Sequence, residues 1–411
     1  MPETKNLAAK RNIPIMKPCM GEAEAAAASR AIMSGWVTQG PEVAAFEKEF
    51  ASYVGAAYAC AVSNCTTALH LALLSCGVAA GDEVVTVSHS YIATANAVRY
   101  CGARPVFVDV DNHYNIDPKL VEAAIGKKTR ALLVVHQMGM PCDMNAIVQI
   151  ARRHNLPVIE DAACAIGSEI NFQSQWQKIG KPIGDIVCFS FHPRKIVSTG
   201  DGGMICTDDA DTLARLKLWR QHGMDIPDTT RHSSAQVVFE SYPVVGYNYR
   251  MTDIQAAVGR EQLKRLPAVI ERRRELAARY IELLKNVNNR GAARETKLGL
   301  PLEPDWARTN YQSFCVRLPD GVDQRTVMQN MLDKGIATRR GIMCAHREAA
   351  YGPGSYSWSC SPDSPCNCNG ECAKLATSAS AQDHCIILPL YHELSHEDQD
   401  FVVEALANAL A

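Results

Sequence analysis

Short apolar runs alternate with amphipathic segments through the first half of this chain. Near-continuous apolar strands separated by helices are typical of a parallel sheet that is covered on both faces. Ligands of such sheets bind at the carboxyl ends of the strands, so the residues directly after each strand are the informative ones. The apolar runs are YACAV (58–62), EVVTV (83–87), PVFVDV (105–110), RALLVV (130–135) and PVIED (157–161), and the predicted helices among them are 66–76, 91–100 and 144–154.

The second half of the chain first extends this pattern and then changes character. Two more strands, IVCFSF (186–191) and GMICT (203–207), precede a helix over 209–221, a polar stretch over 222–241 that we predict to be a mobile loop, and a helix over 252–285 with a break at Pro267. Shorter strands and helices follow. We therefore predict an α/β protein with a large domain (14–265), an N-terminal arm (1–13) and a small C-terminal α+β domain (266–411).

Composition limits the class of protein. The chain has 47% hydrophobic and 21% charged residues, as in soluble globular proteins and unlike disordered chains, collagens or coiled coils. With a formal net charge of −2, the protein has no overall positive electrostatic potential that would attract nucleic acid, so we expect no nucleic-acid partner. No stretch approaches the ~18 apolar residues that span a bilayer, and no apolar run follows the first basic residues, so we expect no membrane association and no signal peptide. Most of the 16 cysteines stand singly in apolar runs, which indicates buried thiols in a reducing, cytoplasmic compartment.

Lys195 and Asp161 both follow strands of the predicted sheet. Lys195 lies in CFSFHPRKIVSTGDGGM, between two apolar strands, and Asp161 ends PVIED. Each residue alone has an ordinary interpretation, as a surface lysine in a loop and as a helix-capping carboxylate. Together they match the needs of pyridoxal phosphate chemistry: a lysine for the Schiff base, and a carboxylate that keeps the pyridine nitrogen protonated so that the ring accepts electrons.

A phosphate site is predicted where a strand ends at Ser63-Asn64-Cys65 and a helix begins at Thr66. Backbone N–H groups and the dipole at a helix N-terminus attract phosphate, although Ser or Thr at a helix start is also an ordinary cap. Tyr91 follows the next strand and is a candidate for stacking on the pyridine ring, while an aromatic side chain there also fits a core.

Seven segments of the chain, in order, match the pattern of a known family. They are SNCTTALHLAL, GDEVVTVSHSYIATANAV, GARPVFVDVD, VIEDAACAIGS, SFHPRKIVSTGDGGM, GYNYRMTDIQAAVGREQL and RRGIMCAHREAAY. The chain thereby resembles the DegT/DnrJ/EryC1/StrS family of pyridoxal-phosphate-dependent aminotransferases, which act mainly on nucleotide-linked keto-sugars. The resemblance runs from about Pro14 to the C-terminal helix. It implies fold type I, with a mixed, mostly parallel sheet between helices and a small C-terminal domain.

The resemblance also implies roles for the matching residues. Lys195 is then the Schiff-base lysine, Asp161 the partner of the pyridine nitrogen, and Tyr91 the ring-stacking aromatic.

The phosphate contacts are implied in the same way. Cys65 and Thr66 fall at the phosphate-binding turn, and Ser190 adds a hydroxyl. Asn248, in GYNYR, falls where the family reaches across a dimer interface to the phosphate of the neighbouring subunit. The resemblance therefore implies a homodimer with shared active sites.

The chain departs from the family pattern at two positions. Cys164 stands where the family usually has Gln, or often His, in contact with the phenolic oxygen of the cofactor. A thiol is a weak donor, so this contact is either lost or made through water. Cys65 stands where the family often has Gly, which is tolerable if the turn needs no positive φ. Lys195 is intact, which argues against the branch of the family that has His there and performs dehydration.

The expected reaction is amino transfer from an amino acid, L-glutamate by family expectation, to a keto-sugar, and the expected acceptor is a nucleotide-linked 4-keto-6-deoxy sugar. His346 falls in a segment that the family places near the active-site mouth, and Arg250 is a candidate for binding the carboxylate of the donor. Two alternatives stay open: a cyclitol ketone or another keto-sugar position as acceptor, and a regulator that binds pyridoxal phosphate without turnover. An added DNA-binding domain would distinguish the second alternative, and the chain has no basic helix-turn-helix segment.

Two further motifs suggest metal binding, and we expect a metal at neither. His392-Glu393-Leu394-Ser395-His396 matches H-E-x-x-H, but Ser395 with Asp398 forms a capping box that would leave His392 outside the helix.

The second motif is SCSPDSPCNCNGEC, in which four thiolates could bind zinc or an iron–sulfur cluster. Its spacing, C-x5-C-x-C-x3-C, lacks a C-x2-C pair, so we expect an unliganded or variably oxidised surface loop. The cysteines are Cys360, Cys366, Cys368 and Cys372.

Overall fold

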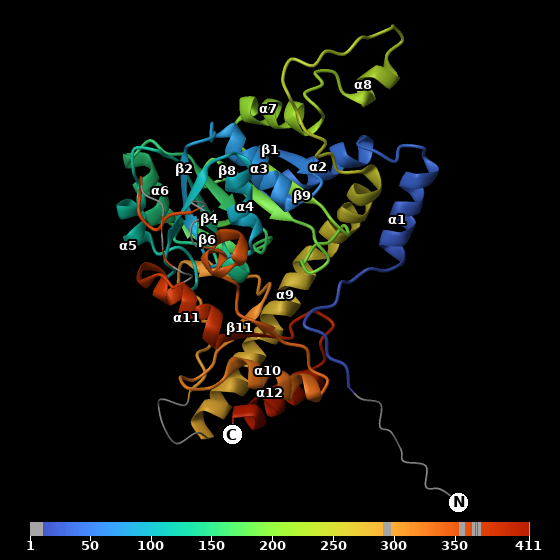
Figure 1. Ribbon diagram of the computed structural model, residues 1–411. Coiled ribbons are helices and arrows are strands. Elements are labelled where there is room, and N and C mark those ends of the chain that lie inside the picture. Colours follow the sequence, from blue (N-terminus) through green and yellow to red (C-terminus); the bar gives the residue numbers. More distant parts are fainter. Residues whose placement is uncertain are drawn as a thin grey trace, which may run out of the picture.

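The computed structural model describes residues 11–290, 297–352, 358–363, 366, 368 and 371–410, and a seven-stranded sheet forms its centre (Figure 1). The strand order is β1-β9-β8-β5-β4-β2-β3. β9 runs antiparallel to both of its neighbours, and all other neighbouring pairs are parallel, which confirms the predicted mixed, mostly parallel sheet. The strands are β1 (Tyr58–Val62), β2 (Glu83–Val87), β3 (Arg104–Val108), β4 (Thr129–Val135), β5 (Val158–Asp161), β8 (Ile186–Ser190) and β9 (Gly203–Thr207).

Helices cover both faces of this sheet. α3 (Cys65–Ser75), α4 (Ala93–Tyr100) and α7 (Ala210–Arg220) pack on one face. α2 (Pro41–Val54), α6 (Met144–Arg153) and the start of a long helix, α9 (Asp253–Arg290), cover the other. Because neither face meets water, β2 and β9 are buried along their whole length, which explains their continuous apolar sequence.

A smaller antiparallel sheet lies at the other end of the molecule. Its strands are β11 (Phe314–Arg317), β12 (Arg339–Arg340) and β13 (Cys385–Leu388), and the nearby helices are α10 (Gln324–Asp333), α11 (Ala376–His384) and α12 (His396–Leu410). A further sheet has the order β10-β6-β7, formed by β10 (Ala307–Arg308), β6 (Glu169–Phe172) and β7 (Gln175–Lys178), and the helices α1 (Glu22–Met33) and α5 (Pro118–Val121) lie elsewhere in the chain. The smaller sheet has the order β11-β13-β12. Its apolar residues form a second core with those of α10, α12 and the end of α9.

The long helix α9 connects the two cores, as Figure 1 shows. Leu266 and Ile270 are buried in the core of the large sheet, whereas Leu276 and Tyr280 are buried in the second core. The predicted break at Pro267 is wrong: α9 is one helix of 38 residues with Pro267 inside it. Proline removes one helical hydrogen bond, but apolar burial on both sides of Pro267 holds the helical path. The domain boundary between residues 265 and 266 stays a prediction.

The polar stretch at 222–241 contains a helix where a loop was predicted. α8 (Asp228–Ser233) begins after Pro227, whose carbonyl accepts a hydrogen bond from the N–H of Arg231 at 3.1 Å. The stretch projects from the large domain in Figure 1.

None of the helices that the structure describes combines the length and the apolar character needed to cross a membrane.

Candidate active site

A cavity of about 720 Å³ lies between the carboxyl ends of the large-sheet strands and the small domain. β12 and β13 close it from the small-domain side, and β5 and β8 end at its floor. Most of the cofactor residues predicted from sequence line this one cavity: Lys195, Asp161, Tyr91, Cys65, Thr66, Ser190 and Cys164. Strand ends from distant parts of the chain meet here because parallel strands share one carboxyl edge.

Lys195 reaches into the cavity from the turn that follows β8. Its Nζ lies 3.0 Å from Sγ of Cys164, to which it donates a hydrogen bond. Burial lowers the pKa of Lys195, but the combined effect of Cys164, Cys65 and Asp161 raises it by more. The pKa of Lys195 therefore lies above its ordinary value. The amine is therefore protonated in the free protein and must give up this proton before it can act as a nucleophile.

Asp161 ends β5 and is only 4% exposed. One carboxylate oxygen accepts a hydrogen bond from Oγ1 of Thr94 at 2.8 Å, and the other accepts one from the N–H of Ala163 at 3.1 Å. Burial raises the pKa of Asp161 above its ordinary value, and these hydrogen bonds offset part of the rise. A buried, oriented carboxylate with raised proton affinity is suited to sharing a proton with a ring nitrogen.

The turn predicted to bind phosphate is held in place by Asn64, the N-cap of α3. Its side chain accepts a hydrogen bond from the N–H of Thr67 at 2.9 Å, which leaves the N–H groups of Cys65 and Thr66 without a partner inside the helix. Cys65 is helical, so this turn does not need glycine at that position.

Gly203 lies directly against this turn, at the start of β9. A Cβ atom on Gly203 would come within 2.6 Å of the Asn64 carbonyl oxygen and 2.9 Å of the Cys65 nitrogen. Only glycine lets β9 pass this close to the turn, so Gly203 shapes the predicted phosphate site.

Tyr91 and Ser190 complete the set in the cavity. Tyr91 lies between β2 and α4 and is 64% exposed, so it does not serve as a core residue. Its ring is available to stack on a flat ligand. Ser190 ends β8 and is half-buried, and its Oγ accepts a hydrogen bond from the N–H of His192 at 3.4 Å.

Asn248, Arg250 and His346 lie outside the cavity wall. Asn248 is exposed and accepts a hydrogen bond from Nε of Arg250 at 3.2 Å. His346 is only 1% exposed, with Nδ1 2.6 Å from Oγ of Ser88, and burial lowers the pKa of His346 to about 4. The roles of the three residues toward phosphate and substrate stay predictions.

Thr94 and Gln312 belong to the site, and sequence reasoning missed both. Thr94 lies one turn beyond Tyr91, and this spacing was the available signal. Gln312 lies far away in sequence: its Nε2 donates to the Arg194 carbonyl at 2.7 Å, and its Oε1 accepts from the N–H of Ile196 at 3.1 Å. Gln312 therefore holds the backbone on both sides of Lys195, and no local sequence pattern predicts this contact.

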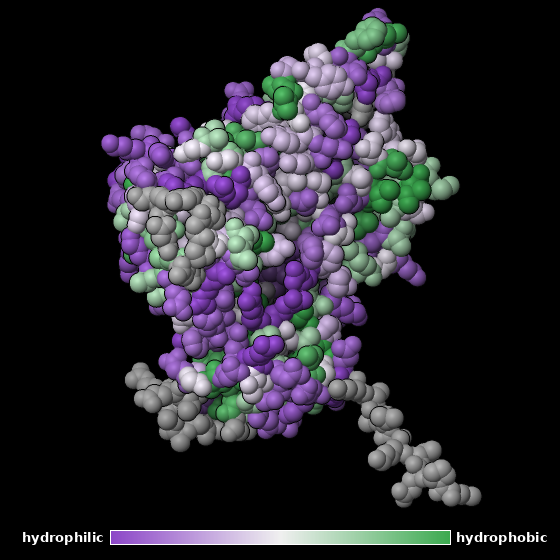
Figure 2. All heavy atoms as spheres, in the orientation of Figure 1, coloured by the Kyte–Doolittle hydropathy of each residue, from purple (hydrophilic) through white to green (hydrophobic). Residues whose placement is uncertain are grey.

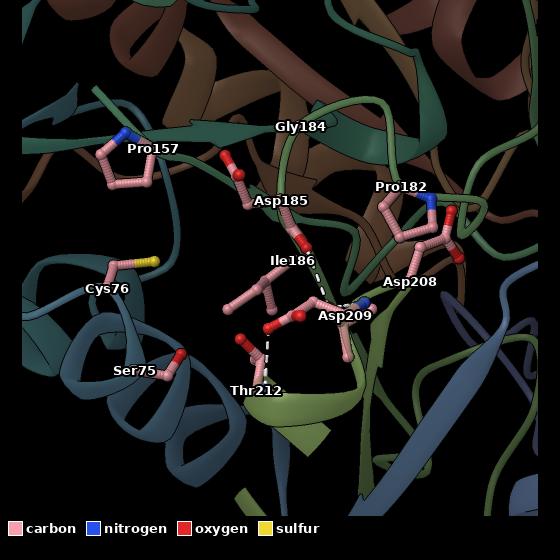
Figure 3. A pocket seen from close by; sticks show the side chains of 11 residues that line it. Ser75, Cys76, Pro157, Pro182, Gly184, Asp185, Ile186, Asp208, Asp209 and Thr212 are labelled. Atoms are coloured by element: carbon pink, nitrogen blue, oxygen red, sulfur yellow. Dashed lines mark hydrogen bonds between the residues drawn. The ribbon is translucent and has the colours of Figure 1, made fainter. Parts of the chain in front are cut away.

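A second cavity, of about 580 Å³, opens at the other end of β5 and β8 (Figure 3). Its acidic side chains are used for local structure: Asp209 accepts from the Thr212 N–H at 2.8 Å, Asp185 from the Val158 N–H at 2.8 Å, and Asp208 from the Ala57 N–H at 2.7 Å. None of the predicted site residues lines it. The first cavity is therefore the better candidate for chemistry.

The capping interpretation of the H-E-x-x-H motif is confirmed. α12 begins at His396, and Oγ of Ser395 accepts a hydrogen bond from the N–H of Asp398 at 3.0 Å. His392 therefore lies before the helix, and the two histidines do not share a helical face.

Comparisons with known proteins identify the family of the chain. SpsC, a spore coat polysaccharide biosynthesis protein of Bacillus subtilis, is 34% identical over 404 residues, which cover 97% of each chain. GDP-perosamine synthase of Caulobacter vibrioides is 45% identical over 308 residues, 74% of this chain and 77% of that one. The crystal structure of the aminotransferase TlmJ from Streptoalloteichus hindustanus superposes with a TM-score of 0.82 at 32% identity, covering 97% and 98% of the two chains. Residues 18–407 match one family throughout, and the chain belongs to it: the DegT/DnrJ/EryC1/StrS aminotransferase family.

Proposed function

We propose that this enzyme, a pyridoxal-phosphate-dependent aminotransferase, moves an amino group from L-glutamate to the keto group of a nucleotide-linked 4-keto-6-deoxy sugar. The observation that carries the proposal is the meeting of Lys195, Asp161 and the phosphate-binding turn in one cavity. The similarity to GDP-perosamine synthase supports a sugar nucleotide as acceptor.

The donor groups of the cavity fit pyridoxal phosphate. The start of α3 leaves the N–H groups of Cys65 and Thr66 free for a phosphate, and Gly203 adds no side chain against this turn. Asp161 supplies the carboxylate for a ring nitrogen, Lys195 the amine for an aldehyde, and exposed Tyr91 a surface for stacking. A phosphate, a basic nitrogen, an aldehyde and a flat ring are the four features of this cofactor.

The chain's own residues then divide the work. When bound, the cofactor supplies an electron-accepting ring for the bonds at the substrate carbon. Lys195 would hold the cofactor and, as a free amine, would move the proton at the substrate Cα as general base and acid. Asp161 keeps a proton at the ring nitrogen, and Thr94 and the N–H of Ala163 hold its carboxylate in position.

Arginines at the cavity wall favour the proposal that the substrates are anionic. Arg194, Arg339 and Arg340 line the cavity, and Arg340 pairs with Glu348 at 3.2 Å. Among the residues that the structure describes, none forms a side-chain hydrogen bond or ion pair with the guanidinium of Arg339. Both the carboxylates of L-glutamate and the diphosphate of a sugar nucleotide need such cations. Arg339 is thus a better placed candidate than Arg250.

We also propose that the enzyme acts in the cytoplasm as a homodimer, with Asn248 reaching the phosphate of the neighbouring subunit. Asn248 is exposed and lies outside the cavity of its own chain. The segment before it carries exposed apolar side chains, with Val237 84%, Phe239 86% and Val245 90% exposed. Figure 2 shows hydrophobic side chains on this projecting part of the surface, which a partner subunit would bury.

The visible absorption spectrum of the purified protein tests the function. A yellow protein that L-glutamate bleaches, and a colourless Lys195→Ala variant, are the expected results. A panel of 4-keto-6-deoxy sugar nucleotides and cyclitol ketones, assayed for amine transfer from the glutamate-treated enzyme, then identifies the acceptor. A protein that stays colourless with added pyridoxal phosphate would overturn the proposal, whereas transfer to a cyclitol alone would overturn only the acceptor.

A further inference from the structure

Four cysteines outside the active site converge in space. The sulfur atoms of Cys360, Cys366, Cys368 and Cys372 all lie within 4.8 Å of one another. The sulfur of Cys366 is 3.2 Å from that of Cys360 and 3.1 Å from that of Cys368. All four are free cysteines. The loop spacing that gave no recognisable motif therefore produces a compact four-sulfur group.

The shape of this group fits a single metal ion. Zinc binds four thiolates tetrahedrally at about 2.3 Å, which places the sulfur atoms about 3.8 Å apart. The observed group is compact enough for this geometry. An iron–sulfur cluster would bind the four thiolates to different iron ions and would hold them farther apart. A tetrahedral arrangement of four sulfur ligands is most often a zinc site.

The surroundings supply the burial that a structural site needs. Cys372 is buried, and the other three cysteines pack against an apolar cluster that includes Phe107, Trp358 and Leu375. Thiols are weak hydrogen-bond donors and acceptors, so four of them satisfy one another poorly in such a place. A bound cation resolves this, because it converts the four sulfurs into ligands.

The backbone that carries the ligands is fastened to the large domain. Ser359 pairs with the edge strand β3: its carbonyl accepts from the Phe107 N–H at 2.6 Å, and its N–H donates to the Pro105 carbonyl at 2.9 Å. The N–H of Cys366 donates to the Trp358 carbonyl at 3.2 Å. Two of the ligands are thus positioned by backbone contacts that need no metal.

A cation also lies beside the group. Nζ of Lys374 donates hydrogen bonds to Oγ of Ser361 and, at 3.5 Å, to the carbonyl of Cys360. Four thiolates and one Zn²⁺ carry a net charge of about −2, which a neighbouring ammonium partly neutralises.

We propose that Cys360, Cys366, Cys368 and Cys372 bind one zinc ion, which fastens this C-terminal segment to β3 and α4 beside the active site. With four protein ligands the site is closed, so its role is structural. The proposal replaces our expectation of an unliganded loop, and it does not depend on the identity of the substrate.

A zinc ion at this place would matter for the cavity because α4 contacts both the cysteine group and the active site. Oη of Tyr351 donates to the side chain of Asn96 on α4 at 2.8 Å, and Ala95 belongs to the same apolar cluster as Cys372. Thr94, the residue before Ala95, donates a hydrogen bond to Asp161. The zinc ion would therefore stabilise the outer side of the helix whose inner side supports the cofactor carboxylate.

Metal analysis of the whole protein tests the proposal. We expect about one zinc per chain in reduced, untagged protein, with X-ray absorption showing four sulfur neighbours at about 2.3 Å. Cys366→Ser and Cys368→Ser should each lower the zinc content at least fivefold. Cys76→Ser, which changes another half-buried cysteine outside the group, should keep it.

The wild-type protein alone can decide the question if the variants do not fold. A mercurial thiol reagent should release one zinc per chain, and reduction with added zinc should restore it. Less than about a tenth of a zinc per chain, with all four thiols freely reactive, would overturn the proposal. So would a disulfide between any two of them, or iron with acid-labile sulfide in place of zinc.

Discussion

The active-site cavity and the four-cysteine group both bring reactive side chains together, but they do so on different scaffolds. The cavity collects Lys195, Asp161 and the turn at Cys65 from the ends of β1, β5 and β8, each of which is fixed by the core of the large sheet. The cysteine group collects its ligands from a short segment that pairs with the edge of β3 through Ser359.

The difference predicts whether a substitution lowers activity or stability. In the cavity the backbone already holds the side chains, so removing one of them costs chemistry and little stability. In the cysteine group a bound zinc ion would add to the few backbone contacts that hold an edge segment, so removing a ligand should cost stability first. The following predictions test this contrast, beginning with the largest expected effect.

Replacing Lys195 by Ala should lower turnover by about 10⁴-fold, since it removes a general acid–base group and the covalent anchor of the cofactor. The melting temperature of the apoprotein should stay close to that of the wild type. Steady-state amine transfer and calorimetry measure the two effects. Lys48→Ala, on the exposed side of α2, is the matched control and should retain full activity. Full turnover by the Lys195 variant would refute the assigned role.

Asp161→Asn should lower turnover by about 10²-fold, because an amide keeps the hydrogen bond from Thr94 but cannot balance a protonated ring nitrogen. The matched control is Asp143→Asn, which changes the carboxylate that caps α6 away from the cavity. The control should affect stability more than turnover. Equal losses of turnover in the two variants would contradict the pairing of Asp161 with the cofactor.

Removing the zinc ion with a chelator should lower the melting temperature by about 5 °C, as expected when a structural metal is lost. Re-addition of zinc to reduced protein should restore it. Calorimetry on wild type and on Cys366→Ser makes the measurement, and the variant should not respond to the chelator. A melting temperature unaffected by metal removal would show that the segment is held by its backbone contacts alone.

Gly203→Ala should weaken pyridoxal phosphate binding by about tenfold, because overpacking against Asn64 and Cys65 costs about 1 to 3 kcal/mol. Fluorescence titration of apoprotein with the cofactor gives the dissociation constant. Gly21→Ala is the control, since its Cβ would meet no atom closer than 3.7 Å. If Gly203→Ala bound the cofactor as tightly as the wild type, the phosphate would lie elsewhere.

Asp161 should also leave a small signature in the pH dependence of stability. Its pKa is raised in the folded protein, so the native state binds the proton more tightly than the unfolded chain does. The contribution of Asp161 to stability therefore falls as the pH rises from its ordinary pKa through the raised value. In urea unfolding of the apoproteins, Asp161→Asn should gain stability relative to wild type across this range. A constant difference between the two would contradict the raised pKa.

Much of the fold followed from pattern alone. Each strand predicted for the large sheet is present within about two residues, a normal uncertainty for element ends. The exceptions show what pattern misses. Pro267 stays helical because apolar neighbours on both sides are buried in cores, and α8 forms within a stretch that has no apolar periodicity.

The sequence by itself determined that Lys195, Asp161 and the turn at Cys65 would meet. The physical reason is that buried parallel strands leave all their carboxyl ends at one edge, whatever the details of packing. Only the tertiary structure decided that Gln312 holds the backbone beside Lys195, that His346 is buried outside the cavity, and that four irregularly spaced cysteines form one group. Those contacts depend on how a second domain and an edge segment pack against the sheet. The spacing of residues along the chain does not reveal such packing.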